Sequence, residues 1–211
     1  MVFRLCVFIV AASFLAGAPL PAVNDWNSVR VTLARQAGFC ACASYEVQVR
    51  GDGLVVLNGQ SNVLLRGQHF APITRTEIEA LVEEFRKADF TSLSGTYGAT
   101  LDADVYTVSI AFDGRPELTI IDRSGPANPP PGLRALEDAI DRIAKTAKWV
   151  DGNDETVASL LFEKYKFDSS IVDWALSRSD PESARKLREA APADPVLAER
   201  VAEFDLRRGR R

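Results

Sequence analysis

The segment SYEVQVRGDGLVVLNG, residues 44–59, constrains the fold most, because two apolar alternating runs flank a glycine-rich turn. Tyr45, Val47 and Val49 alternate with polar residues, and a period of two places them on one face of a strand. The Gly-Asp-Gly sequence at residues 51–53 supplies turn chemistry, since glycine adopts positive φ without steric cost. The segment therefore predicts an antiparallel β-hairpin with one buried face.

Similar alternation elsewhere in the chain predicts the remaining strands of a sheet. The predicted strands cover residues 29–34, 45–50, 54–59, 106–112 and 117–122, and residues 63–70 are a candidate for a further short strand. Asn58-Gly59 predicts the turn that follows the hairpin. Tight turns between successive strands favour antiparallel pairing. We expect the first strand, near residues 29–33, to lie at an edge, and either this edge or the concave side of the sheet to present a contact surface.

Two amphipathic segments predict helices that cover the sheet. Thr74 and Glu77 have the spacing of a capping box, so each side chain can bond a free backbone N–H of the other residue. The apolar stripe that follows has helical spacing and consists of Ile78, Leu81, Val82 and Phe85. Apolar residues at three- and four-residue steps predict a second continuous helix over residues 133–150.

These elements predict an α+β domain over residues 24–150, in the order β-β-β-α-β-β-α, with an antiparallel sheet and two helices on one face. After residue 150 no strand pattern remains, and residues 151–206 predict a short all-helical appendage. Asp194-Pro195 has the form of an N-cap followed by proline at the first helical position. Residues 207–211 form a basic tail.

The N-terminal sequence MVFRLCVFIVAASFLAGAPLPA, residues 1–22, has the layout of a secretory signal peptide. Arg4 precedes an apolar run that ends in small residues and prolines, and this run is shorter than a membrane span needs. Cleavage after Ala18 would put a proline next to the cut, and cleavage after Ala22 avoids this. We therefore expect a periplasmic or secreted protein with no membrane span after cleavage. Cys6 would leave with the leader.

Charge and motifs exclude several functional classes. The chain has 25 basic and 29 acidic residues, and a net charge of −4 does not suit a nucleic-acid binder, which needs a basic face. The sequence contains no Gly-x-Ser-x-Gly elbow, phosphate loop, dinucleotide fingerprint or zinc-protease motif. His69 is the only histidine, and we expect a structural role for it. The sequence therefore predicts no catalytic residues and no cofactor.

Cys40 and Cys42 remain after loss of the leader, in a compartment where thiols tend to pair. In a regular strand their Cβ atoms, like their Cα atoms, would lie about 6.6 Å apart, whereas a disulfide needs Cβ atoms about 3.8 Å apart. A turn at Ala41 would allow the bond. Four states stay open: a disulfide across Ala41, buried or free thiols, intermolecular or redox exchange, and a metal site. A metal would need more ligands, and no spacing selects Asp102, Asp104 or another acid to supply them. We therefore predict no metal site.

The residues W-x-x-V-R-V-T-L, followed by Cys42-x-x-Tyr45-x-Val47-x-Val49 and the Gly-Asp-Gly turn, resemble the bacterial domain of unknown function 6438. The resemblance covers about residues 26–150 and implies an exported module, sometimes followed by ankyrin-like helices, with no known activity. The C-terminal helices faintly resemble a degenerate ankyrin unit. The family pattern has cysteines four residues apart. Here Gly38 stands at the first position and Ala43 replaces the family's proline, so no cysteine role is carried over.

The sequence thus predicts an exported, non-enzymatic binding or interaction module of the bacterial cell envelope, with an unidentified protein or envelope component as its partner. The alternative is an envelope thiol redox protein or sensor that uses Cys40 and Cys42. A third possibility is a structural domain whose helices dock a larger envelope assembly. The resemblance also extends through Tyr97, Asp102 and Asp104, which we take as a candidate functional loop.

Overall fold

The computed structural model describes residues 19–93, 95–125, 130, 132–163, 167–177 and 181–209. Most of the predicted signal peptide, residues 1–18, lies outside this part of the chain, as do Arg210 and Arg211 of the predicted basic tail. Within the described residues, no helix combines the length and the apolar character that a membrane crossing requires.

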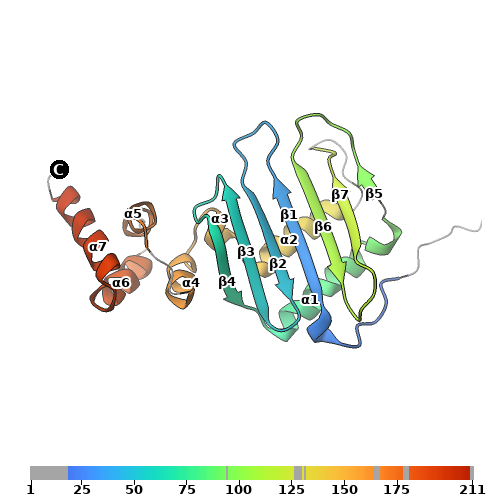
Figure 1. Cartoon of the computed structure of the whole chain (residues 1–211), viewed down its shortest axis with the longest axis horizontal. Coiled ribbons are helices and arrows are strands. Elements are labelled where there is room, and N and C mark those ends of the chain that lie inside the picture. Colours follow the sequence, from blue (N-terminus) through green and yellow to red (C-terminus); the bar gives the residue numbers. More distant parts are fainter. Residues whose placement is uncertain are drawn as a thin grey trace, which may run out of the picture.

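The strands of the described residues form one seven-stranded sheet in the order β4-β3-β2-β1-β6-β7-β5 (Figure 1). They are β1 (Arg30–Gln36), β2 (Ser44–Arg50), β3 (Leu54–Ser61), β4 (Gly67–Pro72), β5 (Gly95–Tyr97), β6 (Val105–Ala111) and β7 (Leu118–Asp122). All neighbours are antiparallel except β5 and β7, which are parallel. The α+β class is confirmed, and the candidate strand at residues 63–70 contributes its second half to β4. The short strand β5 carries no alternation and was not predicted.

The predicted hairpin is formed by β2 and β3. Val47 pairs with Leu57 and Val49 with Val55, and all four side chains are buried. The turn contains Gly53, whose φ of +94° favours glycine. The second predicted turn is wrong, because Asn58-Gly59 lies inside β3 and pairs with β4. The chain turns later, at residues 62–66, and the backbone of that turn approaches Gly59 too closely to leave room for a Cβ.

Strand β1 lies in the middle of the sheet, with β2 on one side and β6 on the other. The expectation of an edge strand at this position is therefore wrong. Both backbone edges of β1 are used in pairing, so it presents no free edge to a partner strand. The sheet ends instead at β4 and β5.

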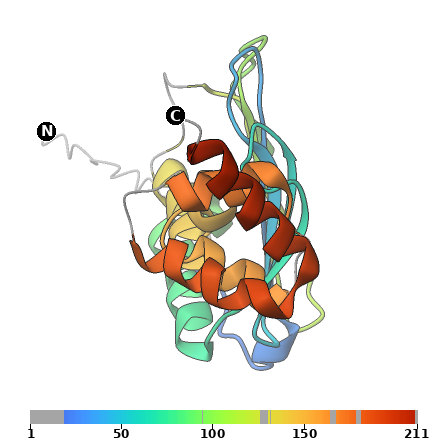
Figure 2. The ribbon, with the colours of Figure 1, turned by 90° about the vertical axis from the view of Figure 1, so that its left-hand side faces the viewer.

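Helices α1 (Arg75–Lys87) and α2 (Leu133–Ala144) cover the same face of the sheet, as the edge-on view in Figure 2 shows. The capping box of Thr74 and Glu77 is present, and its helix buries the predicted stripe of Ile78, Leu81, Val82 and Phe85. The predicted helix over residues 133–150 is interrupted, because Lys145 adopts a φ of +55°. The chain then resumes as the short helix α3 (Ala147–Val150).

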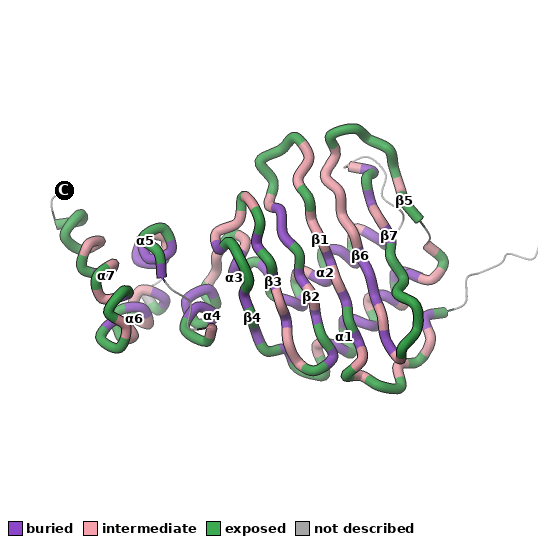
Figure 3. Tube along the Cα trace, viewed as in Figure 1, coloured by how far each residue is buried: buried purple, intermediate pink, exposed green. Residues whose placement is uncertain are grey.

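The core lies between the sheet and these two helices and continues into the chain after residue 150, where Leu160, Ile171 and Leu197 belong to the same cluster. Figure 3 marks the buried residues along the chain. Val31 and Leu33 of the central strand are fully buried, as are Leu81 of α1 and Ile140 of α2. Leu20, just after the undescribed N-terminal residues, is only 6% exposed and belongs to the same core.

The C-terminal helices extend beyond the β4 edge of the sheet (Figures 1 and 2). They are α4 (Thr156–Glu163), α5 (Ser169–Ser177), α6 (Pro181–Ala190) and α7 (Pro195–Arg208). Single 3-10 turns, η1 (Trp26–Ser28), η2 (Phe90–Ser92) and η3 (Ala191–Ala193), complete the described elements. Asp194 caps α7 as its sequence predicts. Arg207, assigned to the tail, lies in α7 and forms an ion pair with Asp173 of α5.

Candidate functional site

Two loops that are far apart in the sequence meet at one end of the sheet. Residues 37–43 connect β1 to β2, and residues 98–104 connect β5 to β6. The backbone N–H of Gly38 donates to Asp104 Oδ1 at 2.8 Å, and that of Phe39 donates to the carbonyl of Asp102 at 3.2 Å. A Cβ on Gly38 would lie 2.0 Å from the Asp102 carbonyl oxygen, so only glycine allows this approach.

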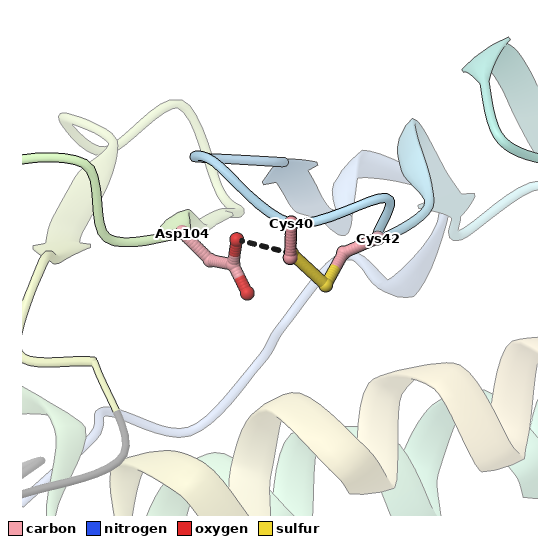
Figure 4. Close-up of side chains that lie close together, drawn as sticks. All are labelled: Cys40, Cys42 and Asp104. Atoms are coloured by element: carbon pink, nitrogen blue, oxygen red, sulfur yellow. Dashed lines mark hydrogen bonds between the residues drawn. A yellow bond between two sulfur atoms is a disulfide. The ribbon is translucent and has the colours of Figure 1, made fainter.

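Cys40 and Cys42 form a close pair in the first of these loops and are joined by a disulfide (Figure 4). Residues 39–41 bend, which brings the two Cα atoms to 5.1 Å, well below the separation expected in a regular strand. Both cysteines are exposed, so the pair is accessible from solvent. Among the four states that the sequence left open, the structure adopts the disulfide across Ala41.

Asp104 approaches this disulfide from the second loop. Its Oδ1 lies 3.2 Å from Sγ of Cys40, the contact that is dashed in Figure 4. A disulfide sulfur carries no proton, so this approach is a van der Waals contact in the oxidised pair and becomes a hydrogen bond only with a free thiol. The Tyr106 hydroxyl lies 3.4 Å from the other carboxylate oxygen. Asp104 is thus held by backbone and side-chain donors that do not depend on the cysteines.

Two adjoining hollows open beside the disulfide, with volumes of about 510 and 220 Å³. We call them together the disulfide pocket. The larger hollow is lined by Cys40, Cys42, Asp102, Ala103, Asp104, Tyr106, Gly125 and Arg134. The smaller hollow shares three of these residues and adds Arg35, Gln36, Ala43, Tyr45, Val150 and Asp151. The pocket therefore lies where both loops meet the end of the sheet.

A row of polar side chains crosses the sheet at this end of the strands. In the register of the sheet, Arg35 lies opposite Tyr45 on one side and Tyr106 on the other. Asp122 continues the row as the partner of Tyr106. Directly opposed residues share a face, so all four side chains point toward the helices.

Acidic side chains of helix α2 neutralise the positive charge of Arg35 in this row. Arg35 pairs with Asp141 at 2.6 Å and with Asp138 at 3.2 Å. The Tyr45 hydroxyl donates to Asp141 at 2.7 Å. Burial, with the negative charge of Asp141 as the next cause, raises the pKa of Tyr45 above its usual value. Tyr45 therefore stays a neutral hydrogen-bond donor that holds Asp141 in place.

Arg134 of α2 contacts the other part of the row, Tyr106 and Asp122, and lines the pocket itself. Its guanidinium lies 4.6 Å from the ring centroid of Tyr106, and that of Arg35 lies 4.7 Å from the same ring. Arg134 also pairs with Asp122 at 3.3 Å and with Glu137 at 3.1 Å. The arginine is therefore fixed between two carboxylates and an aromatic ring.

Glu137 is completely buried, and neither carboxylate oxygen has a hydrogen-bond partner among the described residues. Its contact with Arg134 has the distance of an ion pair without hydrogen-bond geometry. Burial raises the pKa of Glu137 to about 7, although the positive charge of Arg134 acts in the opposite direction. The negative charge of Asp122 adds to the increase.

The architecture around the pocket corresponds to a known family. The family model described as Domain of unknown function (DUF6438) matches residues 29–144. The chain belongs to the DUF6438 family. No curated protein matches the chain. The DUF6438 region extends from the residue before β1 to the end of α2 and so contains the whole sheet and both covering helices. Helices α4 to α7 lie outside it, and their ankyrin-like character stays a prediction.

The DUF6438 domain brings together most of the residues that the sequence selected. Cys40, Cys42, Asp102 and Asp104 all line the larger hollow. Tyr97 does not, because it lies on β5, where its carbonyl accepts from the N–H of Arg123. The two cysteines and the two aspartates therefore form the site without Tyr97, the third member of the predicted loop.

Sequence reasoning did not assign Arg35, Arg134 or Tyr106 to the DUF6438 pocket. A signal was present for two of them: Arg35 is in phase with the buried Val31 and Leu33, and Tyr106 is in phase with the buried face of β6. A charged residue on the apolar face of a strand needs a partner, which marks it as part of a buried polar group. Arg134 shows no such signal, because it stands among other charged residues of an amphipathic helix.

Proposed function

We propose that this DUF6438 protein is an exported, non-enzymatic binding module of the bacterial cell envelope, and that it binds a small, positively charged ligand in the disulfide pocket. The observation that carries the proposal is the charge of the lining. Asp102 and Asp104 face the larger hollow, whereas its one cationic side chain, Arg134, is already paired with the carboxylate of Asp122.

The other charged residues around the pocket also favour a positively charged ligand. Arg35 of the smaller hollow is paired with Asp138 and Asp141, so it offers little unpaired positive charge. Asp151 adds a further carboxylate to the lining. Acidic groups therefore outnumber basic ones around the pocket, and the local field attracts cations.

The size and the rim of the pocket also suit a small ligand. A volume of about 510 Å³ falls within the range of roughly 300–1,000 Å³ that is common for small-molecule sites. The rim is restrained by the disulfide and by the hydrogen bonds of Gly38 and Phe39 to the opposite loop. A restrained rim lowers the conformational entropy that a ligand must remove on binding.

Calorimetric titration of the oxidised protein with putrescine, a small diamine, tests the proposal, with succinate as the anionic control. We expect binding of putrescine only, and a loss of at least about tenfold in affinity for Asp104→Asn, since a charge-assisted contact contributes about 1.5–3 kcal/mol. Glu79→Gln removes an exposed acid of α1 and should leave the affinity unchanged. Equal affinity in Asp104→Asn and Glu79→Gln, or preferred binding of succinate, would contradict the proposal.

Export has its own support and its own test. The leader-like N-terminal sequence and the disulfide are both typical of proteins that leave the reducing cytosol. The mass of the protein purified from the envelope identifies its first residue. It also shows, by alkylation before and after reduction, whether Cys40 and Cys42 are paired in the cell. An intact Met1 with both thiols free would contradict export.

The alternative function is thiol redox exchange, which the exposure of both cysteines favours. Asp104 argues against it, because the negative carboxylate beside Sγ of Cys40 opposes formation of a thiolate there. The rate of exchange with glutathione separates the two functions. A rate no faster than that of an unstrained peptide disulfide contradicts the redox function, and a much faster rate that Cys40→Ser abolishes supports it.

A further inference from the structure

Three potential metal ligands converge at the rim of the pocket. One sulfur from each of Cys40 and Cys42 and one oxygen from Asp104 all lie within 4.8 Å of one another (Figure 4). Among the described residues, this is the one cluster of at least three cysteine, histidine or acidic side chains with such spacing. Thiolate and carboxylate are both ligands that zinc accepts.

We propose that the reduced form of this cluster binds a thiophilic divalent cation such as Zn²⁺ through Cys40, Cys42 and Asp104. The proposal goes beyond the binding function above, because it concerns the reduced protein, whereas the diamine site belongs to the oxidised one. A negative result for one of these two proposals therefore leaves the other proposal intact.

Metal binding requires that a dithiol first reduce the Cys40–Cys42 disulfide. The dithiol gives two electrons and two protons to the disulfide. The Cys40–Cys42 bond breaks, two thiols form, and the reductant becomes a cyclic disulfide. Each thiol then loses its proton as its sulfur binds the cation, so one cation displaces two protons. In the oxidised form neither sulfur is a thiolate, and the disulfide therefore prevents metal binding.

The geometry needs only a local change. Ligand atoms around a tetrahedral zinc are about 3.5–3.8 Å apart, given bond lengths of about 2.0–2.3 Å. Asp104 Oδ1 already lies 3.2 Å from Sγ of Cys40, so the two sulfurs are the atoms that must separate. Residues 39–41 are exposed and lie outside helices and strands, so rotation of the cysteine side chains can provide this separation.

Asp104 is positioned for this role before any metal arrives. Its Oδ1 accepts the backbone N–H of Gly38 at 2.8 Å, a contact that does not involve the sulfurs. Such an outer hydrogen bond orients a ligating carboxylate. All three ligands line the larger hollow, so the fourth tetrahedral position is open to a water molecule.

The test uses the full-length chain, reduced with a phosphine, desalted under anaerobic conditions and titrated with Cd²⁺ as a spectroscopic probe for Zn²⁺. The readout is the ultraviolet charge-transfer band of cadmium thiolates, followed by competition with Zn²⁺. We expect one equivalent to bind with a two-sulfur band, and no band for the oxidised protein. No band in the reduced protein, or equal binding in the oxidised one, would overturn the proposal.

The role of Asp104 needs a matched control. Loss of an outer-shell partner alone costs about 10–100-fold in metal affinity, and Asp104 is proposed as a direct ligand, so Asp104→Asn should weaken Zn²⁺ binding at least about tenfold. Glu79→Gln changes an exposed acid of α1 outside the pocket, so this variant should bind Zn²⁺ as the parent does. Equal affinities in the two variants would overturn the assignment of Asp104. Asp104→Glu, which keeps the carboxylate, should restore part of the loss if the loop is intact.

Discussion

Glu163 of α4 lies 2.8 Å from His69 of β4, with the carboxylate Oε2 facing the ring Nδ1, and both side chains are buried. The other ring nitrogen of His69 faces the carbonyl of Arg66 at 3.1 Å. A neutral imidazole carries one N–H, so satisfying both contacts requires a second proton, held on Nδ1 or on Glu163. The pair joins the first C-terminal helix to the edge of the sheet.

The second oxygen of Glu163 accepts from Trp149 Nε1 at 2.9 Å and from the Ser159 hydroxyl at 2.7 Å. Glutamine at position 163 can meet every contact, with its oxygen toward Trp149 and its NH₂ toward a neutral His69. We therefore expect Glu163→Gln to change the free energy of unfolding by no more than about 1 kcal/mol. Glu163→Ala should cost about 3–5 kcal/mol, because it leaves buried polar groups without partners.

Urea denaturation of the two variants measures this difference, and Glu79→Ala, at an exposed residue of α1, is the control. An exposed substitution should stay within about 0.5 kcal/mol of the parent. If Glu163→Gln were as destabilising as Glu163→Ala, the contact would depend on the negative charge of the carboxylate and not on its hydrogen bonds.

Glu137 predicts a pH dependence of stability. Its pKa is raised from 4.5 to about 7 in the fold, so the native state holds this proton more tightly than the unfolded state does. The free energy of unfolding should therefore fall as pH rises from about 4.5 to 7, by on the order of 3 kcal/mol from this group. Glu137→Gln should remove that part of the slope and be more stable than the parent at pH 8.

Denaturation curves of parent and Glu137→Gln between pH 4 and pH 8 check this expectation. The difference between them isolates Glu137 from other titrating groups. Glu79→Gln, exposed on α1, controls for the loss of one acid. Parallel curves for the parent and Glu137→Gln would show that Glu137 stays ionised beside Arg134.

The close approach of the two loops at Gly38 leaves no room for a larger residue at the rim of the disulfide pocket. Gly38→Ala would place a Cβ 2.0 Å from the Asp102 carbonyl oxygen, so the two loops must separate. We expect a loss of about 1–3 kcal/mol in the free energy of unfolding, together with faster reduction of the Cys40–Cys42 disulfide. Ala41→Ser, at an exposed residue of the same loop, should change neither quantity. An unchanged rate of disulfide reduction in Gly38→Ala would show that the second loop does not protect the disulfide.

The burial of Leu20 predicts that the last residues of the predicted leader, residues 19–22, contribute to the stability of the fold. Its side chain is 6% exposed in the core, so Leu20→Ala should cost about 2 kcal/mol or more. A chain beginning at Pro19 should then be more stable to urea than one beginning at Val23, since only the first retains Leu20. Ala22→Ser, at an exposed position, is the control. Equal stability of the two shortened chains would contradict the assignment of Leu20 to the core.

Sequence patterns were sufficient to predict a structural element wherever that element depends on residues close together in the chain. The alternation in β2 and β3, the capping box of Thr74 and the proline start of α7 depend on residues within one or two turns of chain. The same local logic failed at Asn58-Gly59, where a turn signal lies inside a strand. There the glycine serves the close approach of a neighbouring loop, which its adjacent residues do not reveal.

The sequence by itself determined the fold class and most strands and helices, because period and capping are properties of short segments. Only the tertiary structure decided what makes the site. It placed β1 at the centre of the sheet, brought Asp104 to Cys40 across 64 residues, and joined Glu163 to His69 across 94. Such pairings depend on strand order and loop approach, which many residues decide jointly and no single motif encodes.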